Sequence, residues 1–257
     1  MKNLLFFFFI LFSVLGMSAE RRQSEIKYGD DERQRMIVSV PENAKDNPVL
    51  VWFHGGGLVG GEPSIPAELI DTDYIIVAPA YRFLSKVDID ACISDAADAT
   101  AWVYKNIDSL GGDTSKIFVG GHSAGGYLAS MIGLDKSRLA KRGIDADSIA
   151  GLFPVSGQAI THYEWRKMNG GSELKPTIDE YAPISYIRPD APPYIIISGD
   201  REQELFGRYE ENAYMWRMMK LLGHPDVKIY EIEGFNHGEM VHPAFHIIKD
   251  NIKRLLK

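Results

Sequence analysis

Short, nearly unbroken apolar runs are the feature that most constrains this chain. They are rich in Val and Ile and bounded by Gly, Pro, Asn, Asp or Ser, and they cover residues 35–40, 49–53, 74–77, 117–119, 149–153 and 194–197. Runs of this kind are typical of strands that are covered on both faces. A seventh run, residues 227–232, alternates between apolar and polar side chains and also predicts a strand.

Between these runs, apolar residues recur at spacings of three and four, which is typical of amphipathic helices. Such stripes cover residues 93–107, 209–222 and 245–255. Strands that alternate with helices predict an α/β fold with a mostly parallel sheet and helices on both faces. In such sheets, functional sites form at the carboxyl ends of the strands.

The amino-terminal residues 1–19 have a different composition. Lys2 precedes an almost continuous apolar run over residues 4–15, and the small residues Gly16, Ser18 and Ala19 follow. This pattern predicts a secretory signal peptide cleaved near Ala19, a secreted or periplasmic location, and a single domain over residues 20–257. The alternative is an uncleaved anchor, but the run is short for a bilayer span of about 20 residues. We expect no membrane span in the mature chain.

Composition excludes several classes of function. The formal net charge is −7 and no basic stretch is present. The chain therefore lacks the positive charge that neutralises nucleic-acid phosphates, and we expect no nucleic-acid partner. The single cysteine, Cys92, rules out an intrachain disulfide. Because Cys92 lies in a helical apolar stripe, we expect a buried small hydrophobe rather than a catalytic thiol.

Residues 121–125 (GHSAG) match the pattern G-x-S-x-G. A predicted strand leads into the pattern and a helix-like stretch, residues 124–132, leads out of it, so the context is strand, sharp turn and helix. Such a turn lifts the Ser123 hydroxyl out of the sheet at a helix N-terminus, where developing negative charge is favoured. We therefore predict that Ser123 is a nucleophile.

Residues 54–57 (HGGG) directly follow the predicted strand 49–53. Glycine backbones can direct N–H groups at a ligand without obstruction. Upstream of a nucleophile turn, this predicts an oxyanion hole formed by the N–H groups of Gly56, Gly57 and Ala124, rather than a flexible loop. We expect His54 to brace its own loop.

A base and an acid should follow later strands. His237 lies on a loop between the strand 227–232 and the last helix, and is the one histidine that combines loop, strand end and chain order. After the strand 194–197, position favours Glu202 as the acid, with Asp200 as the alternative. The acid orients the imidazole and stabilises the imidazolium.

Residues 157–181 fit the alternation poorly. They carry Tyr163, Trp165 and the pair Gly170-Gly171 between two predicted strands. We predict a short lid over the site, the alternative being an ordinary connecting loop with one helix.

Together, these motifs resemble the α/β-hydrolase superfamily, most closely its hormone-sensitive-lipase-like esterase branch, and arylformamidases are similar too. The resemblance rests on HGGG at 54–57, Tyr81-Arg82, GHSAGG at 121–126, SYIRPDAPP at 185–193 and the late His237. It implies a Ser–acid–His triad that hydrolyses small carboxylic esters, with no cofactor and no metal. Three departures stand out: no acidic residue precedes Tyr81, the acid position holds Glu202 where Asp is common, and an extended N-terminal cap is missing.

The sequence thus predicts a short-acyl carboxylesterase that acts on a small-molecule ester through an acyl-enzyme on Ser123. Export suggests a carbohydrate acetylesterase. An amide hydrolase, either a peptidase or a formamidase, could use the same triad and remains an alternative. A catalytically inactive hydrolase fold that only binds is a third reading, against which the full set of reactive residues argues. Nothing in the sequence predicts the oligomeric state.

Overall fold

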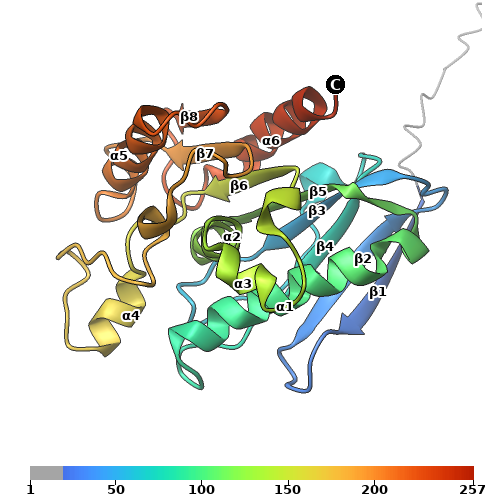
Figure 1. Cartoon of the computed structure of the whole chain (residues 1–257), viewed down its shortest axis with the longest axis horizontal. Helices are drawn as coiled ribbons and strands as arrows, with labels where there is room; N and C mark the ends of the chain where they lie inside the picture. Colours follow the sequence, from blue (N-terminus) through green and yellow to red (C-terminus); the bar gives the residue numbers. More distant parts are fainter. Residues whose placement is uncertain (1–19) are drawn as a thin grey trace, which may run out of the picture.

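A computed structural model describes residues 20–257. The predicted signal peptide lies outside the described residues, so its cleavage stays a prediction. Eight strands form one sheet in the order β1-β2-β4-β3-β5-β6-β7-β8 (Figure 1). The strands are β1 (Arg21–Lys27), β2 (Arg35–Pro41), β3 (Asn47–Phe53), β4 (Ile75–Pro79), β5 (Gly112–His122), β6 (Gly151–Val155), β7 (Tyr194–Gly199) and β8 (Val227–Ile232).

The predicted mostly parallel sheet is confirmed. All pairings from β4 through β8 are parallel, whereas β1 pairs antiparallel with β2 and β2 pairs antiparallel with β4. Each predicted run overlaps a strand, although β6 begins at Gly151 rather than at Ile149. The strand β1 has no counterpart among the predicted strands, because its residues RRQSEIK are mostly polar and largely exposed at the edge of the sheet.

Helices cover both faces of the sheet, as predicted. They are α1 (Ile89–Asn106), α2 (Ala124–Leu134), α3 (Lys136–Ala140), α4 (Tyr163–Met168), α5 (Arg208–Leu221) and α6 (Val241–Leu255), and short 3-10 turns lie at Ala67–Leu69, Ile107–Leu110, Ala146–Ser148 and Pro183–Tyr186. In Figure 1, α1, α2 and α3 lie on one side of the sheet and α6 on the other.

The strand β3 shows why two cores form. Successive side chains of a strand point to opposite faces. Val49 and Val51 pack into the cluster that contains the buried faces of α1 and α2. Leu50 and Trp52 pack into the cluster that contains α6, where the rings of Trp52 and Phe245 are 4.7 Å apart. Unbroken apolar strands therefore supply both cores.

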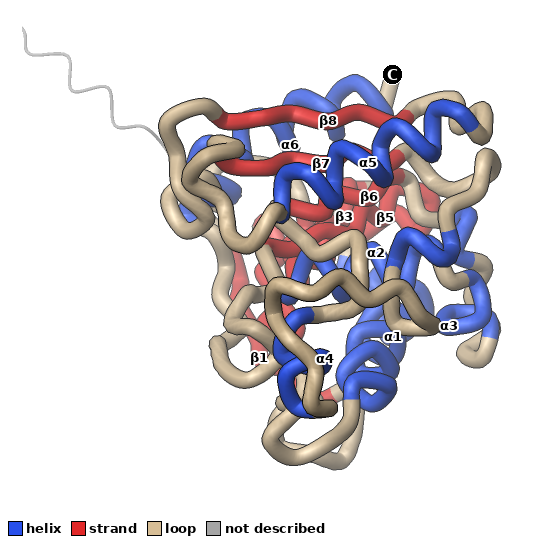
Figure 2. Tube along the Cα trace, turned by 90° about the vertical axis from the view of Figure 1, so that its left-hand side faces the viewer, coloured by secondary structure: helices blue, strands red, loops and turns tan. Residues whose placement is uncertain are grey.

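The parallel strands bring several loops to one edge of the sheet. In register, Phe53 at the end of β3 lies beside Gly121 near the end of β5, and β6, β7 and β8 run in the same direction. The segments that follow these strands, which carry the HGGG, GHSAG and His237 motifs, therefore start from the same edge. In Figure 2, α5 lies in the upper half of the view near β7 and β8, and α4 lies in the lower half. Within residues 20–257, no helix combines the length and the apolar character needed to cross a bilayer.

Candidate active site

Ser123 occupies a sharp turn between β5 and α2. Its backbone angles, φ 55° and ψ −116°, are unfavourable for a residue with a side chain and typically cost about 1–3 kcal/mol. The surroundings hold this conformation, because the Ser123 N–H donates to the Val155 carbonyl of β6 at 2.8 Å. Glycine is required nearby, since a Cβ on Gly125 would lie 2.0 Å from the Phe53 carbonyl oxygen. The strain therefore sits at the predicted nucleophile.

His237 reaches Ser123 from the loop between β8 and α6. Its Nε2 lies 2.9 Å from Ser123 Oγ. On its other side, Nδ1 lies 2.8 Å from a carboxylate oxygen of Glu204. A carboxylate only accepts, so Nδ1 carries the proton and Nε2 is free to accept one from the serine hydroxyl. The structure thus brings Ser123 and His237 together, as the sequence predicted.

The acid that contacts His237 is Glu204, and the prediction of Glu202 or Asp200 at this position is wrong. Glu202 is exposed and lines an acidic hollow at the surface with Glu231 and other residues. Asp200 instead joins its own loop to the loop that carries His237: its carboxylate accepts the N–H groups of Glu202 at 2.9 Å and Gly234 at 2.7 Å.

The reason for the difference is a turn that sequence spacing does not reveal. After β7, the N–H groups of Gln203 and Glu204 both donate to the Asp200 carbonyl, at 2.9 Å. The chain therefore winds back on itself, and a residue two positions beyond Glu202 faces the histidine. The only sequence signal for Glu204 was its place as a third carboxylate after the same strand.

The environment of Glu204 keeps it ionised. Its side chain is 1% exposed, and its oxygens accept from Gly199 N–H at 3.0 Å, Leu205 N–H at 3.1 Å and Ser156 Oγ at 2.7 Å, besides His237. Burial raises the pKa of Glu204, but the hydrogen bond and charge of His237, together with the donors Ser156 and Gly199, outweigh it and lower the pKa to about 2.

The glycine loop that carries two of the predicted oxyanion-hole donors begins beside Ser123. A Cβ on the neighbouring Gly55 would lie 3.4 Å from Ser123 Cβ. Gly56 has φ 113° and Gly57 has φ 66°, and Ala124 is the first residue of α2. Within residues 20–257, the N–H groups of Gly56 and Gly57 donate to no other backbone group. An oxyanion-hole donor must be unpaired in this way, and the role of these groups as donors stays a prediction.

Comparison with known proteins agrees with this geometry. The BD-FAE family model matches residues 36–206, well over half of the chain. The chain belongs to the BD-FAE family. Among curated proteins, this BD-FAE family member is 26% identical over 260 residues to Esterase LipC of Mycobacterium tuberculosis, covering 88% of this chain and 62% of LipC. The chain spans less than two thirds of the length of the curated relatives it matches.

Solved structures confirm the α/β-hydrolase fold of this BD-FAE family member. A truncated carbohydrate esterase from gut microbiota superposes with a TM-score of 0.76 at 14% identity, covering 93% of this chain and 98% of that one. Esterase 2 of Thermogutta terrifontis gives a TM-score of 0.71 at 21% identity, covering 89% and 94%.

Two further histidines support the site. His54 Nδ1 lies 2.6 Å from the Gly55 carbonyl, and its ring stacks on Tyr81 at 4.3 Å. Tyr81 in turn donates its hydroxyl to the His54 carbonyl at 2.9 Å. Burial lowers the pKa of His54 to about 4. His54 is therefore neutral at physiological pH and fixes the glycine loop, as predicted.

His122, which precedes the nucleophile, holds the His237 loop. Its Nε2 lies 2.8 Å from the His237 carbonyl oxygen, which can only accept, so His122 is the donor. Burial, followed by the charge of His237, lowers the pKa of His122 to about 4. A neutral His122 therefore ties the backbone of the base to the elbow.

The segment 157–181, predicted as a lid, contains the short helix α4 and reaches the glycine loop. The Tyr163 hydroxyl lies 3.0 Å from where a Cβ on Gly57 would be, and the Tyr163 ring lies 5.7 Å from Phe206. The segment thus borders the site, and its role as a lid stays a prediction.

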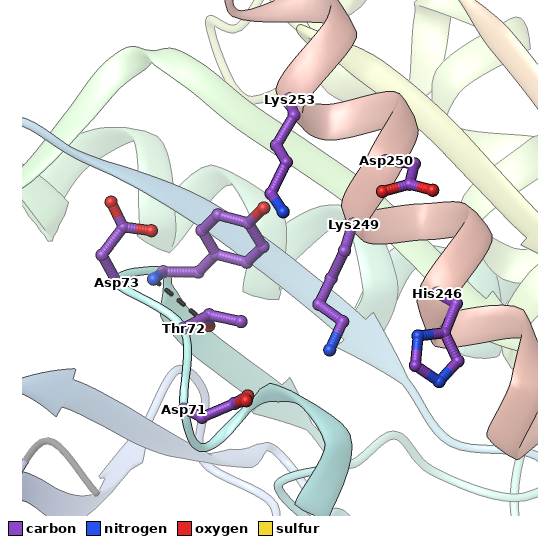
Figure 3. A pocket seen from close by; sticks show the side chains of 8 residues that line it. Asp71, Thr72, Asp73, His246, Lys249, Asp250 and Lys253 are labelled. Atoms are coloured by element: carbon purple, nitrogen blue, oxygen red, sulfur yellow. Dashed lines mark hydrogen bonds between the residues drawn. The ribbon is translucent and has the colours of Figure 1, made fainter. Parts of the chain in front are cut away.

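A polar pocket of about 510 Å³ lies elsewhere (Figure 3). It is formed by the loop before β4 and by α6, and its lining includes Asp71, Asp73, Lys249 and Lys253. Because β4 begins there, the pocket is at the opposite edge of the sheet from Ser123, and its charges of both signs define no catalytic group. Among the described residues, no cluster of His, Cys, Asp and Glu side chains could hold a metal ion.

Proposed function

We propose that this chain is a serine hydrolase that cleaves small carboxylic esters through an acyl-enzyme on Ser123. The observation that carries the proposal is the continuous hydrogen-bonded chain from Ser123 through His237 to Glu204, at 2.9 and 2.8 Å. Nucleophile, base and orienting acid within hydrogen-bond reach are the requirements for this chemistry.

In the first half of the reaction, Ser123 Oγ attacks the acyl carbon while its proton passes to Nε2 of His237. The anionic Glu204 stabilises the imidazolium that forms. The N–H groups of Gly56, Gly57 and Ala124 stabilise the tetrahedral oxyanion. The carbon–oxygen bond to the alcohol then breaks, and His237 donates its Nε2 proton to the leaving oxygen.

In the second half, a water molecule attacks the acyl carbon of the Ser123 ester and gives its proton to His237. Collapse of the tetrahedral intermediate releases the carboxylic acid, and the proton returns to Ser123. The low pKa of Glu204 supports this scheme, because the carboxylate stays charged throughout.

The relatives support ester hydrolysis. LipC is named an esterase, and NlhH of Mycobacterium tuberculosis, 38% identical over 121 residues, is named a carboxylesterase. Thermogutta terrifontis esterase 2 is phosphorylated by paraoxon. We therefore expect a fluorophosphonate to label this chain at Ser123.

The test compares wild type with Ser123→Ala on p-nitrophenyl acetate. We expect turnover and fluorophosphonate labelling in the wild type and the loss of both in the variant. Ser130→Ala is the matched control, because Ser130 is also buried but hydrogen-bonds to Gly126 and Tyr194. Turnover that survives in Ser123→Ala would refute the assignment.

For the substrate, we propose a short acyl group, with acetylated carbohydrate as the natural class. The support is the structural similarity to a carbohydrate esterase and the predicted export signal. Acetate release from acetylated oligosaccharides, measured beside longer p-nitrophenyl esters, aryl amides and formylated aryl amines, tests this choice. Faster cleavage of amides than of esters would favour the amide-hydrolase alternative instead. Detection of the enzyme in culture medium or periplasm tests the proposed export.

A further inference from the structure

Ser156 lies directly after β6, is completely buried and has a φ of 48°. A positive φ is unfavourable for a residue with a Cβ. A glycine, such as the next residue Gly157, adopts a positive φ more easily. The backbone is nevertheless fixed on both sides. The Ser156 N–H donates to the Ile197 carbonyl at 2.7 Å, and its carbonyl accepts from the buried Arg208 guanidinium. A serine that is held in a strained conformation by its neighbours, next to a reactive centre, points to a function for its side chain.

The Ser156 hydroxyl contacts both partners of the base–acid pair. Its Oγ lies 2.7 Å from Oε1 of Glu204 and 2.9 Å from Nδ1 of His237. The ionised carboxylate can only accept, so the Ser156 proton points at Glu204. An oxygen lone pair then remains on the side of His237, where it faces the Nδ1–H. Two acceptors, Glu204 Oε2 and Ser156 Oγ, therefore share that proton.

The contacts of Glu204 show why a second anchor matters. Glutamate has one more rotatable bond than aspartate, so more rotamer freedom must be lost to hold its carboxylate in one place. The backbone N–H of Gly199 donates to Oε1 of Glu204, and the backbone N–H of Leu205 donates to Oε2. Among the described residues, Ser156 is the only side chain with hydrogen bonds to both Glu204 and His237.

We propose that Ser156 is a positioning residue of the hydrolytic reaction. It fixes the Glu204 carboxylate and holds His237 in the tautomer with its proton on Nδ1, so that Nε2 is ready to accept the proton of Ser123. The proposal rests on the proposed function, because it assigns Ser156 a part in the same proton transfer.

A double-mutant cycle tests whether Ser156 acts through Glu204. We expect Ser156→Ala to lower kcat on p-nitrophenyl acetate roughly tenfold with KM nearly unchanged, because the interaction serves the transition state. In a Glu204→Gln background, the same substitution should change kcat by less than about twofold, since the group it positions is gone. An equal loss in both backgrounds, or none in either, would overturn the proposal.

Two further variants separate positioning from stability. Ser156→Gly removes the hydroxyl and relieves the positive φ, so we expect a melting temperature at or above that of Ser156→Ala with the same loss of kcat. Ser130→Ala also deletes a buried hydroxyl with two hydrogen bonds, and should lower the melting temperature while leaving kcat within about twofold. If Ser156→Gly kept wild-type kcat, the hydroxyl would have no part in positioning.

The rate of Ser123 labelling by a fluorophosphonate gives a second readout of the cycle. If the wild type labelled but cleaved no ester, the proposed ester substrate would fail while the cycle, run on labelling rates, still decided the role of Ser156. If the wild type neither labelled nor turned over, the proposed function would fail and the role of Ser156 with it.

Discussion

Glu204→Gln is the substitution that examines the site most directly. The change keeps the size of the side chain and removes its charge. With Glu204 Oε2 2.8 Å from His237 Nδ1 and an effective dielectric constant of about 20, the attraction between carboxylate and imidazolium is about 6 kcal/mol. The amide dipole of Gln recovers part of this. We expect a loss of about 4–5 kcal/mol of transition-state stabilisation, which corresponds to a decrease in kcat of about 10³-fold to 10⁴-fold.

The assay is steady-state hydrolysis of p-nitrophenyl acetate at a pH where the wild type is fully active, together with a thermal melt. The matched control is Glu202→Gln, which removes the same charge from the same loop at an exposed position. It should keep kcat within about twofold, as surface substitutions usually do. The reasoning fails if Glu204→Gln keeps more than about a tenth of the wild-type kcat, or if Glu202→Gln loses as much.

Stability against pH checks the same residue independently of activity. The pKa of Glu204 is depressed from 4.5 to about 2 in the folded state. Its contribution to stability is therefore present above pH 4.5 and is lost as the pH falls toward 2, and its size is about 3 kcal/mol. The difference in unfolding free energy between wild type and Glu204→Gln should shrink by about that amount over this window. Urea denaturation at several pH values measures it, and a constant difference would contradict the low pKa.

Other substitutions test the strained and buried positions. Ser123→Gly should abolish turnover yet melt at a higher temperature than Ser123→Ala, because glycine relieves a backbone strain of about 1–3 kcal/mol; equal melting temperatures would argue against the strain. Gly56→Ala should lose most folded protein or most activity, because its Cβ would lie 2.1 Å from the Gly60 carbonyl oxygen. The control is Gly143→Ala, which is also at positive φ but has open space around it. It should lower the free energy of unfolding, measured by chemical denaturation, by only about 1 kcal/mol. Cys92 is buried, and burial raises its pKa to about 12, so a thiol reagent should modify it only in the denatured protein; rapid modification of the native protein would show that the helix α1 opens.

The choice between Glu202, Asp200 and Glu204 marks the limit of prediction from spacing. Sequence order places an acid after the strand β7, and that part of the prediction is correct. Which carboxylate faces His237 depends on a turn held by two hydrogen bonds to the Asp200 carbonyl. No local sequence pattern in residues 200–204 predicts that turn.

Ser156 was missed for a similar reason. A serine after a strand is ordinary in sequence, and its importance arises from residues 48 and 81 positions away along the chain. Contacts over such distances exist only once β6, β7 and β8 lie side by side. The polar edge strand β1 was not predicted, because an exposed strand does not require an apolar sequence pattern.

The sequence by itself determined the layered architecture, the nucleophile turn at Ser123, the glycine loop and the loop that carries His237. These features depend on local steric and hydrophobic requirements, which each segment satisfies with its own residues: unbroken apolar strands, helical stripes, and glycines where backbones nearly touch. Only the tertiary structure decided that Glu204 faces His237 and that Ser156 joins them. Both depend on how loops from separate strands turn at the edge of the sheet, and that geometry is set by hydrogen bonds between distant segments.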